Sequence, residues 1–93
     1  MAIFDITHLH ALTQMKELFP ELTEKQFQFS LCWVWGIGVQ EIAAMNGCSP
    51  EAVKKLLQRC RERFGVSTLE AMRNIMSLRL FTALWGMTAR ITK

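Results

Sequence analysis

The sequence predicts an all-α fold, with five helices in a single domain that spans residues 1–93. Apolar residues recur every three or four positions along most of the chain, which is the spacing of amphipathic helices. No stretch alternates between apolar and polar residues as a strand would. Capping residues, glycines and prolines divide the chain at short intervals, as expected for a compact helical domain with short connections.

The first predicted helix lies within residues 1–20, where Pro20 stops it and Asp5 is a candidate cap. Its apolar positions fall on one side of the helix. We expect that side to cover the core or a seam between two subunits. The positions are Ile6, Leu9, Leu12, Met15, Leu18 and Phe19.

The second predicted helix begins near Glu24. Thr23 and Gln26 have the spacing of a capping box, in which each side chain bonds to the backbone N–H of the other residue. Gly36 and Gly38 should end the helix, because glycine readily adopts the left-handed conformation that closes a helix. The predicted inward positions are Phe27, Leu31, Val34 and Trp35.

Residues 39–46 and 50–64 form a short and a longer predicted helix, joined by the turn Gly47-Cys48-Ser49. Ser49 followed by proline is a strong helix start, since serine caps free N–H groups and proline suits the first helical position. Gly65 should end the longer helix. Its apolar side comprises Val53, Leu56, Leu57, Cys60 and Phe64. This arrangement is typical of a helix-turn-helix, whose second helix enters the major groove of DNA.

The last predicted helix occupies residues 68–93, with a capping box at Ser67 and Glu70 and an end between Ala83 and Arg90. It is apolar over most of its circumference, so it must be covered on more than one side. We expect one side to pack on its own domain and another to meet a second subunit. Ordinary core packing and a membrane-surface helix are the alternatives. The predicted dimer interface consists of Met72, Ile75, Met76, Leu80, Phe81, Leu84 and Trp85.

The charge distribution indicates an anionic partner. Residues 1–53 carry six acids and two bases, whereas residues 54–93 carry nine bases and two acids. The net charges of −4 and +7 add to the +3 of the whole chain. A basic half suits nucleic acid or a membrane surface, and a merely solubilising surface is the alternative.

Basic and amide side chains cover the sides of the 50–64 helix that lie away from its apolar stripe. Such side chains can donate to base edges and neutralise phosphates. Glu51 and Glu62 on the same helix would repel phosphate, and a solvated charged surface is the alternative interpretation. Lys54, Lys55 and Gln58 are predicted to read bases, Arg59, Arg61 and Arg63 to contact phosphates, and Ser49 to belong to the same DNA-binding set.

Several short motifs follow one another in a fixed order across residues 22–72. They are Leu22-Thr23-Glu24-Lys25, Gly36, Glu41-Ile42-Ala43, Gly47-Cys48-Ser49, Val53-Lys54, Phe64-Gly65-Val66 and Glu70-Ala71. This region, a little over half of the chain, resembles the LuxR-type (GerE-like) helix-turn-helix domain. The resemblance implies a four-helix DNA-binding domain with its helix-turn-helix core over residues 22–67. Here it has an extra helix before the core and an extended helix after it.

The resemblance also implies a function: a bacterial, sequence-specific transcription regulator that binds double-stranded DNA as a homodimer on two half-sites. Ala52 stands where that family usually has threonine. An alternative therefore stays open, in which the chain modulates another regulator through its apolar C-terminal helix and binds DNA weakly or not at all.

No enzyme activity, cofactor or metal site is expected. Cys32, Cys48 and Cys60 lack metal-ligand or disulfide spacing, and reduced cysteines suit a cytoplasmic protein. Cys32 and Cys60 lie among apolar positions, where we expect small core residues. His8 and His10 would point to different faces of the first helix. The uncharged stretch 26–40 is too short for a membrane span, and no signal peptide is apparent.

Overall fold

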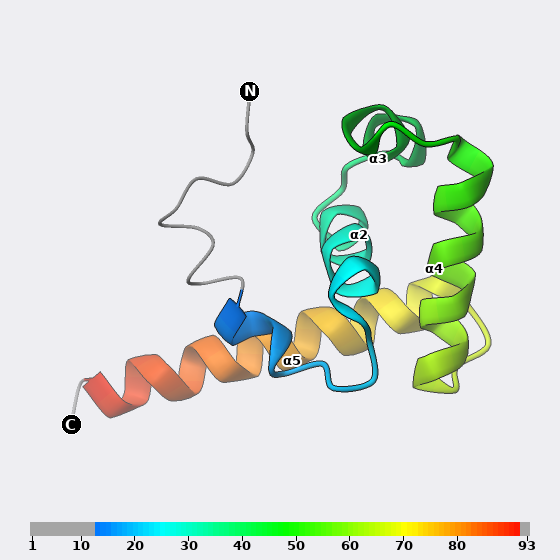
Figure 1. Cartoon of the computed structure of the whole chain (residues 1–93). Helices are drawn as coiled ribbons and strands as arrows, with labels where there is room; N and C mark the ends of the chain where they lie inside the picture. The colour runs from blue at the N-terminus through cyan, green and yellow to red at the C-terminus, as the bar shows by residue number, and fades with distance from the viewer. Residues whose placement is uncertain (1–12, 92–93) are drawn as a thin grey trace.

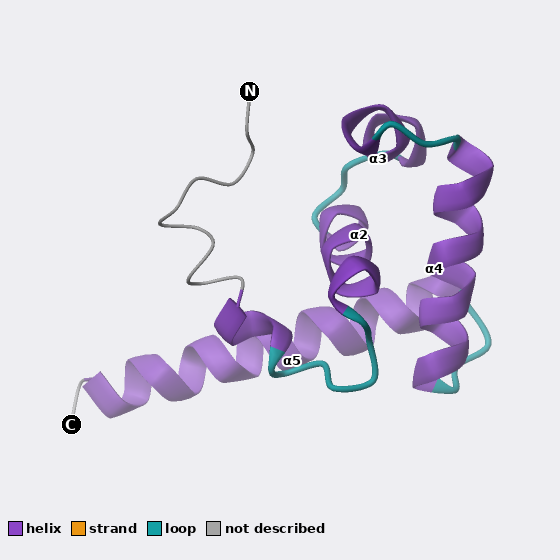
Figure 2. Ribbon diagram, in the orientation of Figure 1, coloured by secondary structure: helices purple, strands orange, loops and turns teal. Residues whose placement is uncertain are grey.

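The computed structural model describes residues 13–91, with side chains described for residues 13–86. Within this part of the chain every regular element is helical (Figure 2), which confirms the all-α prediction of five helices. Residues 13–16 are helical, and they are followed by α2 (Glu24–Val34), α3 (Val39–Asn46), α4 (Pro50–Phe64) and α5 (Leu69–Ile91). The expectations for Asp5, Ile6, His8, Leu9, His10 and Leu12 lie outside the described residues.

The longest helix, α5, runs along one side of the molecule, and α2 crosses it (Figure 1). α4 packs against α2 and against the N-terminal part of α5. α3 lies at the N-terminal end of α4, away from α5. The C-terminal end of α5 extends beyond this body of packed helices.

Local capping signals fix the beginnings of α2 and α4. The Thr23 hydroxyl accepts from the Gln26 N–H at 3.1 Å, and the Gln26 side chain accepts from the Thr23 N–H at 3.0 Å. Ser49 Oγ accepts from the Ala52 N–H at 3.1 Å, with proline at the first helical position. These bonds satisfy N–H groups that have no partner within the helix. Both predicted helix starts are confirmed.

The start of α5 differs from the prediction. Thr68, and not Ser67, caps the helix, because its hydroxyl accepts from the Ala71 N–H at 3.0 Å. After Gly65 the Val66 N–H bonds back to the Arg61 carbonyl, so the chain needs both Val66 and Ser67 to leave α4. α5 then continues through Gly86 to Ile91, one residue past the predicted range for its end.

One cluster of buried side chains holds the helices together. Phe19 stacks on Phe27 at 5.6 Å between ring centroids and meets the edge of Phe64 at 6.3 Å. Cys32 and Cys60 are buried, as predicted. Other core residues include Leu22, Phe29, Leu31, Ile42, Ala43, Val53, Leu57, Met72 and Met76. Most come from the predicted apolar stripes.

Three predicted positions are corrected. Met72 and Met76 are fully buried in the core of the chain itself, so they offer no surface to a second subunit, and that part of the dimer prediction is wrong. Trp35 was expected inside but is 62% exposed. α2 ends at Val34, so Trp35 lies in the cap where the chain turns away from the helix axis.

Arg79 fastens the segment before α2 to the middle of α5. Its guanidinium donates to the Leu18 carbonyl at 2.9 Å and to both Glu21 carboxylate oxygens at 2.8 and 2.6 Å. It also lies 5.4 Å from the ring centroids of Phe19 and Phe64. The hydrogen bond from Arg79 lowers the pKa of Glu21 below its ordinary value. This contact holds residues 18–21 in place ahead of α2.

Candidate nucleic-acid interface

The helix pair α3 and α4 is joined by a tight turn. Gly47 adopts the left-handed conformation, with φ of 64°. Residues with a Cβ atom are strained in this conformation, whereas glycine is not. The Cys48 N–H bonds back to the Ala43 carbonyl at 3.0 Å and closes the end of α3. Ile42 and Ala43 are buried in the core and Ser49 caps the next helix. The turn therefore sets the direction of α4 relative to α3.

α2 and α4 approach through small side chains. Ser30 is fully buried, and its hydroxyl donates to the carbonyls of Gln26 at 2.7 Å and Phe27 at 3.1 Å. The Cys60 thiol of α4 lies 3.7 Å from the same Gln26 carbonyl. Burial raises the pKa of Cys60 to about 11, so this thiol stays protonated and can donate. The contact fixes one side of α4 against the core.

The opposite side of α4 is exposed and basic. Val53, Leu57 and Cys60 face the core, whereas Lys54, Lys55, Gln58, Arg59 and Arg63 are all exposed. Lys54, Lys55 and Arg59 make no ion pair or side-chain hydrogen bond within the described part of the chain. These cations are therefore available to an external anion.

Three residues of the predicted DNA-binding set, Gln58, Arg61 and Ser49, have hydrogen-bond partners within the chain. Arg61 is half-buried, and its guanidinium donates to Gln58 Oε1 at 2.8 Å and to the Val66 carbonyl at 2.7 Å. It ties the end of α4 to the following loop, so its guanidinium is engaged within the fold. The Ser49 hydroxyl is exposed but serves as the cap of α4.

Two carboxylates share the exposed side of α4. Glu51 and Glu62 are exposed, and neither pairs with a cation of that helix at 4.0 Å or less. Glu51 lies in the first turn, where a negative charge interacts favourably with the helix dipole. The surface therefore combines a cationic majority with two separated negative charges.

Lys25 is a basic residue outside the DNA-binding set predicted for residues 49–63. It lies on α2, yet it lines the same concavity of about 370 Å3 as Lys55 and Arg59 of α4. The two helices are separated in sequence and meet only through packing. The residue spacing within either helix therefore could not predict that Lys25 lies beside Lys55 and Arg59.

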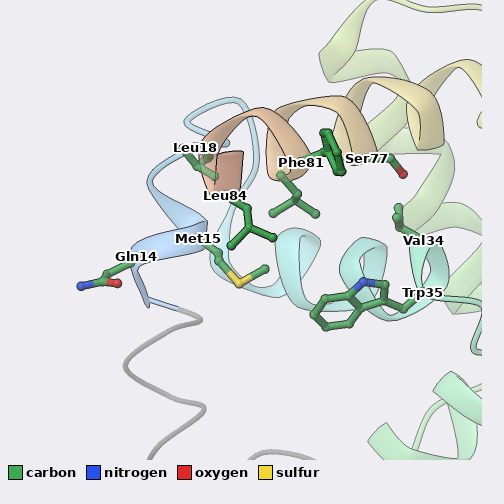
Figure 3. Close-up of a pocket in the computed structure, with 10 residues that line it drawn as sticks. Gln14, Met15, Leu18, Val34, Trp35, Ser77, Phe81 and Leu84 are labelled. Carbon is green, nitrogen blue, oxygen red and sulfur yellow. The ribbon is translucent and has the colours of Figure 1, made fainter. Parts of the chain in front are cut away.

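An apolar surface lies on α5, and we call Leu78, Phe81, Leu84 and Trp85 the α5 apolar surface. These side chains are between 63% and 67% exposed. Ile75 and Leu80 are only half-buried and border it. A neighbouring groove of about 510 Å3 separates α5 from the end of α2 and the segment before it (Figure 3). Its lining includes Met15, Leu18, Val34, Leu80, Phe81 and Leu84.

The described residues include no group of three or more metal-ligating side chains. No helix in this part of the chain combines the length and hydropathy of a membrane span. Comparison of the chain with known protein families, with curated proteins and with solved structures finds no match.

Proposed function

We propose that this protein is a sequence-specific, DNA-binding transcription regulator that inserts α4 into the major groove and acts as a homodimer. One observation carries the proposal: α4 follows a tight helix-turn-helix connection and exposes Lys54, Lys55 and Arg59, which have no ion-pair partner among the described residues, on the side away from the core. Sequence-independent affinity for DNA comes from such cations, and specificity from polar groups at base edges.

The residues of α4 divide between these two roles. The major groove is about 12 Å wide and admits a helix, whose N-terminal turns go deepest. Lys54 and Lys55 can donate to guanine O6 and N7. Gln58 accepts from Arg61 through its oxygen, which leaves its amide N–H groups as donors to a base. Arg59 and Arg63 lie one and two turns later and suit the phosphates.

The homodimer is supported by the α5 apolar surface. A contiguous patch of exposed apolar side chains often marks a surface that binds another protein. Arg79 is the one charged residue between positions 74 and 86, and it is engaged by Glu21. The surface is therefore nearly uncharged, so two copies can meet through it without electrostatic repulsion. A two-fold pairing would present two copies of α4 to two half-sites of the DNA.

The test of DNA binding is the double substitution Lys54→Ala with Lys55→Ala. Duplexes selected from a random library by the wild-type protein serve as the ligand, and fluorescence anisotropy measures affinity. Each lost base contact costs about 1–3 kcal/mol, so affinity should fall at least 30-fold while helicity stays unchanged. The matched control is Glu51→Gln with Glu62→Gln, which removes phosphate repulsion and should strengthen binding. Native affinity of the lysine variant would refute the assignment of α4.

The second candidate function is a protein-interaction module that modulates another regulator, and the α5 apolar surface specifically favours it. Phe81→Glu with Trp85→Glu places charges on that surface without touching α4. If the protein is a DNA-binding homodimer, sedimentation should show this variant as a monomer with weaker DNA binding. A wild-type monomer that binds no duplex and forms a defined complex with another regulator would support the second function instead.

A further inference from the structure

The concavity between α2 and α4 gathers positive charge from two helices. Lys25 comes from the first turn of α2, and Lys55 and Arg59 come from successive turns of α4. All three side chains are exposed, and none has an ion-pair partner within the described residues. The ammonium group of Lys25 lies 5.7 Å from the ring centroid of Phe29. The concavity is therefore a place where three cations face the same space.

The positions of these cations oppose helix stability in two respects. A lysine in the first turn of a helix opposes the helix dipole, which favours negative charge at that end. Lys55 and Arg59 stand four residues apart, where like charges repel. An anion bound between the two helices would attract all three cations and so offset both unfavourable interactions.

The remaining walls suit a small oxyanion. Gln26 uses its side-chain oxygen to cap Thr23, which leaves its amide N–H groups free to donate. The α2 N-terminus adds partial positive charge from backbone N–H groups. Ala52 lies on the α4 wall with a side chain of one carbon, so it leaves space for a ligand. The volume of the concavity, about 370 Å3, exceeds what one phosphate group needs.

We propose that this concavity binds one phosphodiester group of the DNA backbone, with Lys25 and Arg59 as its cationic ligands, while Lys55, the base-reading residue beside them, adds positive potential at its edge. The inference rests on the proposed DNA-binding function and adds α2 to the interface. Because the ligands come from both helices, the bound phosphate fixes how deeply and at what angle α4 enters the groove. Lys25 thereby contributes affinity that does not depend on base sequence.

The test compares wild type with Lys25→Ala, Lys25→Arg and the control Lys16→Ala. Lys16 lies in the helical segment 13–16 before α2, outside the concavity, and donates to the Phe19 carbonyl at 3.4 Å. DNA affinity is measured by anisotropy between 0.05 and 0.3 M salt. Losing one phosphate contact lowers the slope of log affinity against log salt by about 0.9, and affinity by about eightfold per protomer at 0.1 M salt.

The expected result is this loss for Lys25→Ala on selected and random duplexes alike, with recovery in Lys25→Arg and no change in Lys16→Ala. Circular dichroism should show native helicity, since Lys25→Ala removes an unfavourable charge from the first turn. If wild type binds DNA and Lys25→Ala binds with the same affinity and slope, the phosphate site is refuted while the proposed function stands. If wild type binds no duplex, both proposals fail.

A second measurement separates backbone phosphate from free phosphate. Inorganic phosphate is titrated while the amide resonances of Thr23 to Gln26 are followed by NMR. Shifts that vanish in Lys25→Ala, together with unchanged DNA affinity of that variant, would identify a free-phosphate site and overturn the assignment to DNA. Loss of DNA affinity in the same variant supports the assignment.

Discussion

Arg79 gives the most quantitative test of how the chain before α2 is held. Arg79→Ala removes one hydrogen bond to the Leu18 carbonyl and two to Glu21. It also removes a cation from beside Phe19 and Phe64. Glu21→Gln is the partner substitution, because it removes the charge of the carboxylate and keeps its shape. The two single variants and the double variant together form a thermodynamic cycle.

The expected loss of stability depends on how exposed the Arg79–Glu21 ion pair is. The side chains of Arg79 and Glu21 are 36% and 30% exposed, so solvent screens their attraction. We therefore assign the ion pair about 1 kcal/mol, the upper end for surface pairs. The bond to the Leu18 carbonyl adds about 1 kcal/mol. Arg79→Ala should cost about 2 kcal/mol in total, and Tm should fall by roughly 8–16 °C for a chain of this size. Glu21→Gln should cost about half as much.

Thermal and urea unfolding followed by circular dichroism at one fixed protein concentration measures these changes. The pH dependence is a second readout. Arg79 lowers the pKa of Glu21 in the folded state below its ordinary 4.5. The ion pair therefore stabilises the protein fully above pH 4.5, and this contribution is lost as pH falls through the folded pKa. Wild type and Glu21→Gln should differ in stability at pH 7 and converge in strong acid.

The thermodynamic cycle decides whether the contact acts as described. A coupling of about 1 kcal/mol between Arg79 and Glu21 is expected. If the single costs add within about 0.3 kcal/mol, the pair contributes nothing as a pair. If Arg79→Ala leaves Tm unchanged, residues 18–21 are not held by this side chain and the reasoning is wrong.

Three further predictions test other parts of the fold. Cys48 is exposed, whereas Cys60 is buried and its pKa is raised to about 11, so iodoacetamide should alkylate Cys48 faster than Cys60 in the folded protein. Equal alkylation rates of Cys48 and Cys60, measured by mass spectrometry, would contradict this. Met76→Ala should cost about 2–5 kcal/mol in urea unfolding, because it leaves a cavity in the core. Gly65→Ala should cost about 1–2 kcal/mol, since φ is 70° there, and an unchanged urea midpoint would argue against that conformation.

The helix boundaries were the most predictable part of the structure because their causes are local. The capping box of Thr23 and Gln26 needs only two side chains three residues apart. The serine cap before proline at the start of α4 and the left-handed Gly47 and Gly65, which end α3 and α4, work in the same way. Each signal acts within one turn, so the sequence alone carries it.

The features that escaped prediction depend on packing between helices. α5 has apolar residues around most of its circumference, so the sequence did not distinguish Met76, which enters the core, from Phe81, which stays outside. The path of α5 across α2 decides between them. Lys25 approaches α4 only because α2 and α4 cross closely, and Arg61 finds its carbonyl partner only after the chain reverses at Gly65.

The side chains of α4 that hold the fold lie on one side of the helix, and those that would contact a ligand lie on the other, so the second group can mutate without disturbing the first. The side chains of α4 that hold the fold together are Val53, Leu56, Leu57, Cys60 and Phe64, and its outward side chains contribute little to packing of the helices. Replacing the outward set combinatorially should therefore yield a library of equally well-folded proteins that differ in what they recognise. New recognition could arise in this scaffold through single-residue steps, each without a loss of stability that later mutations would have to repair.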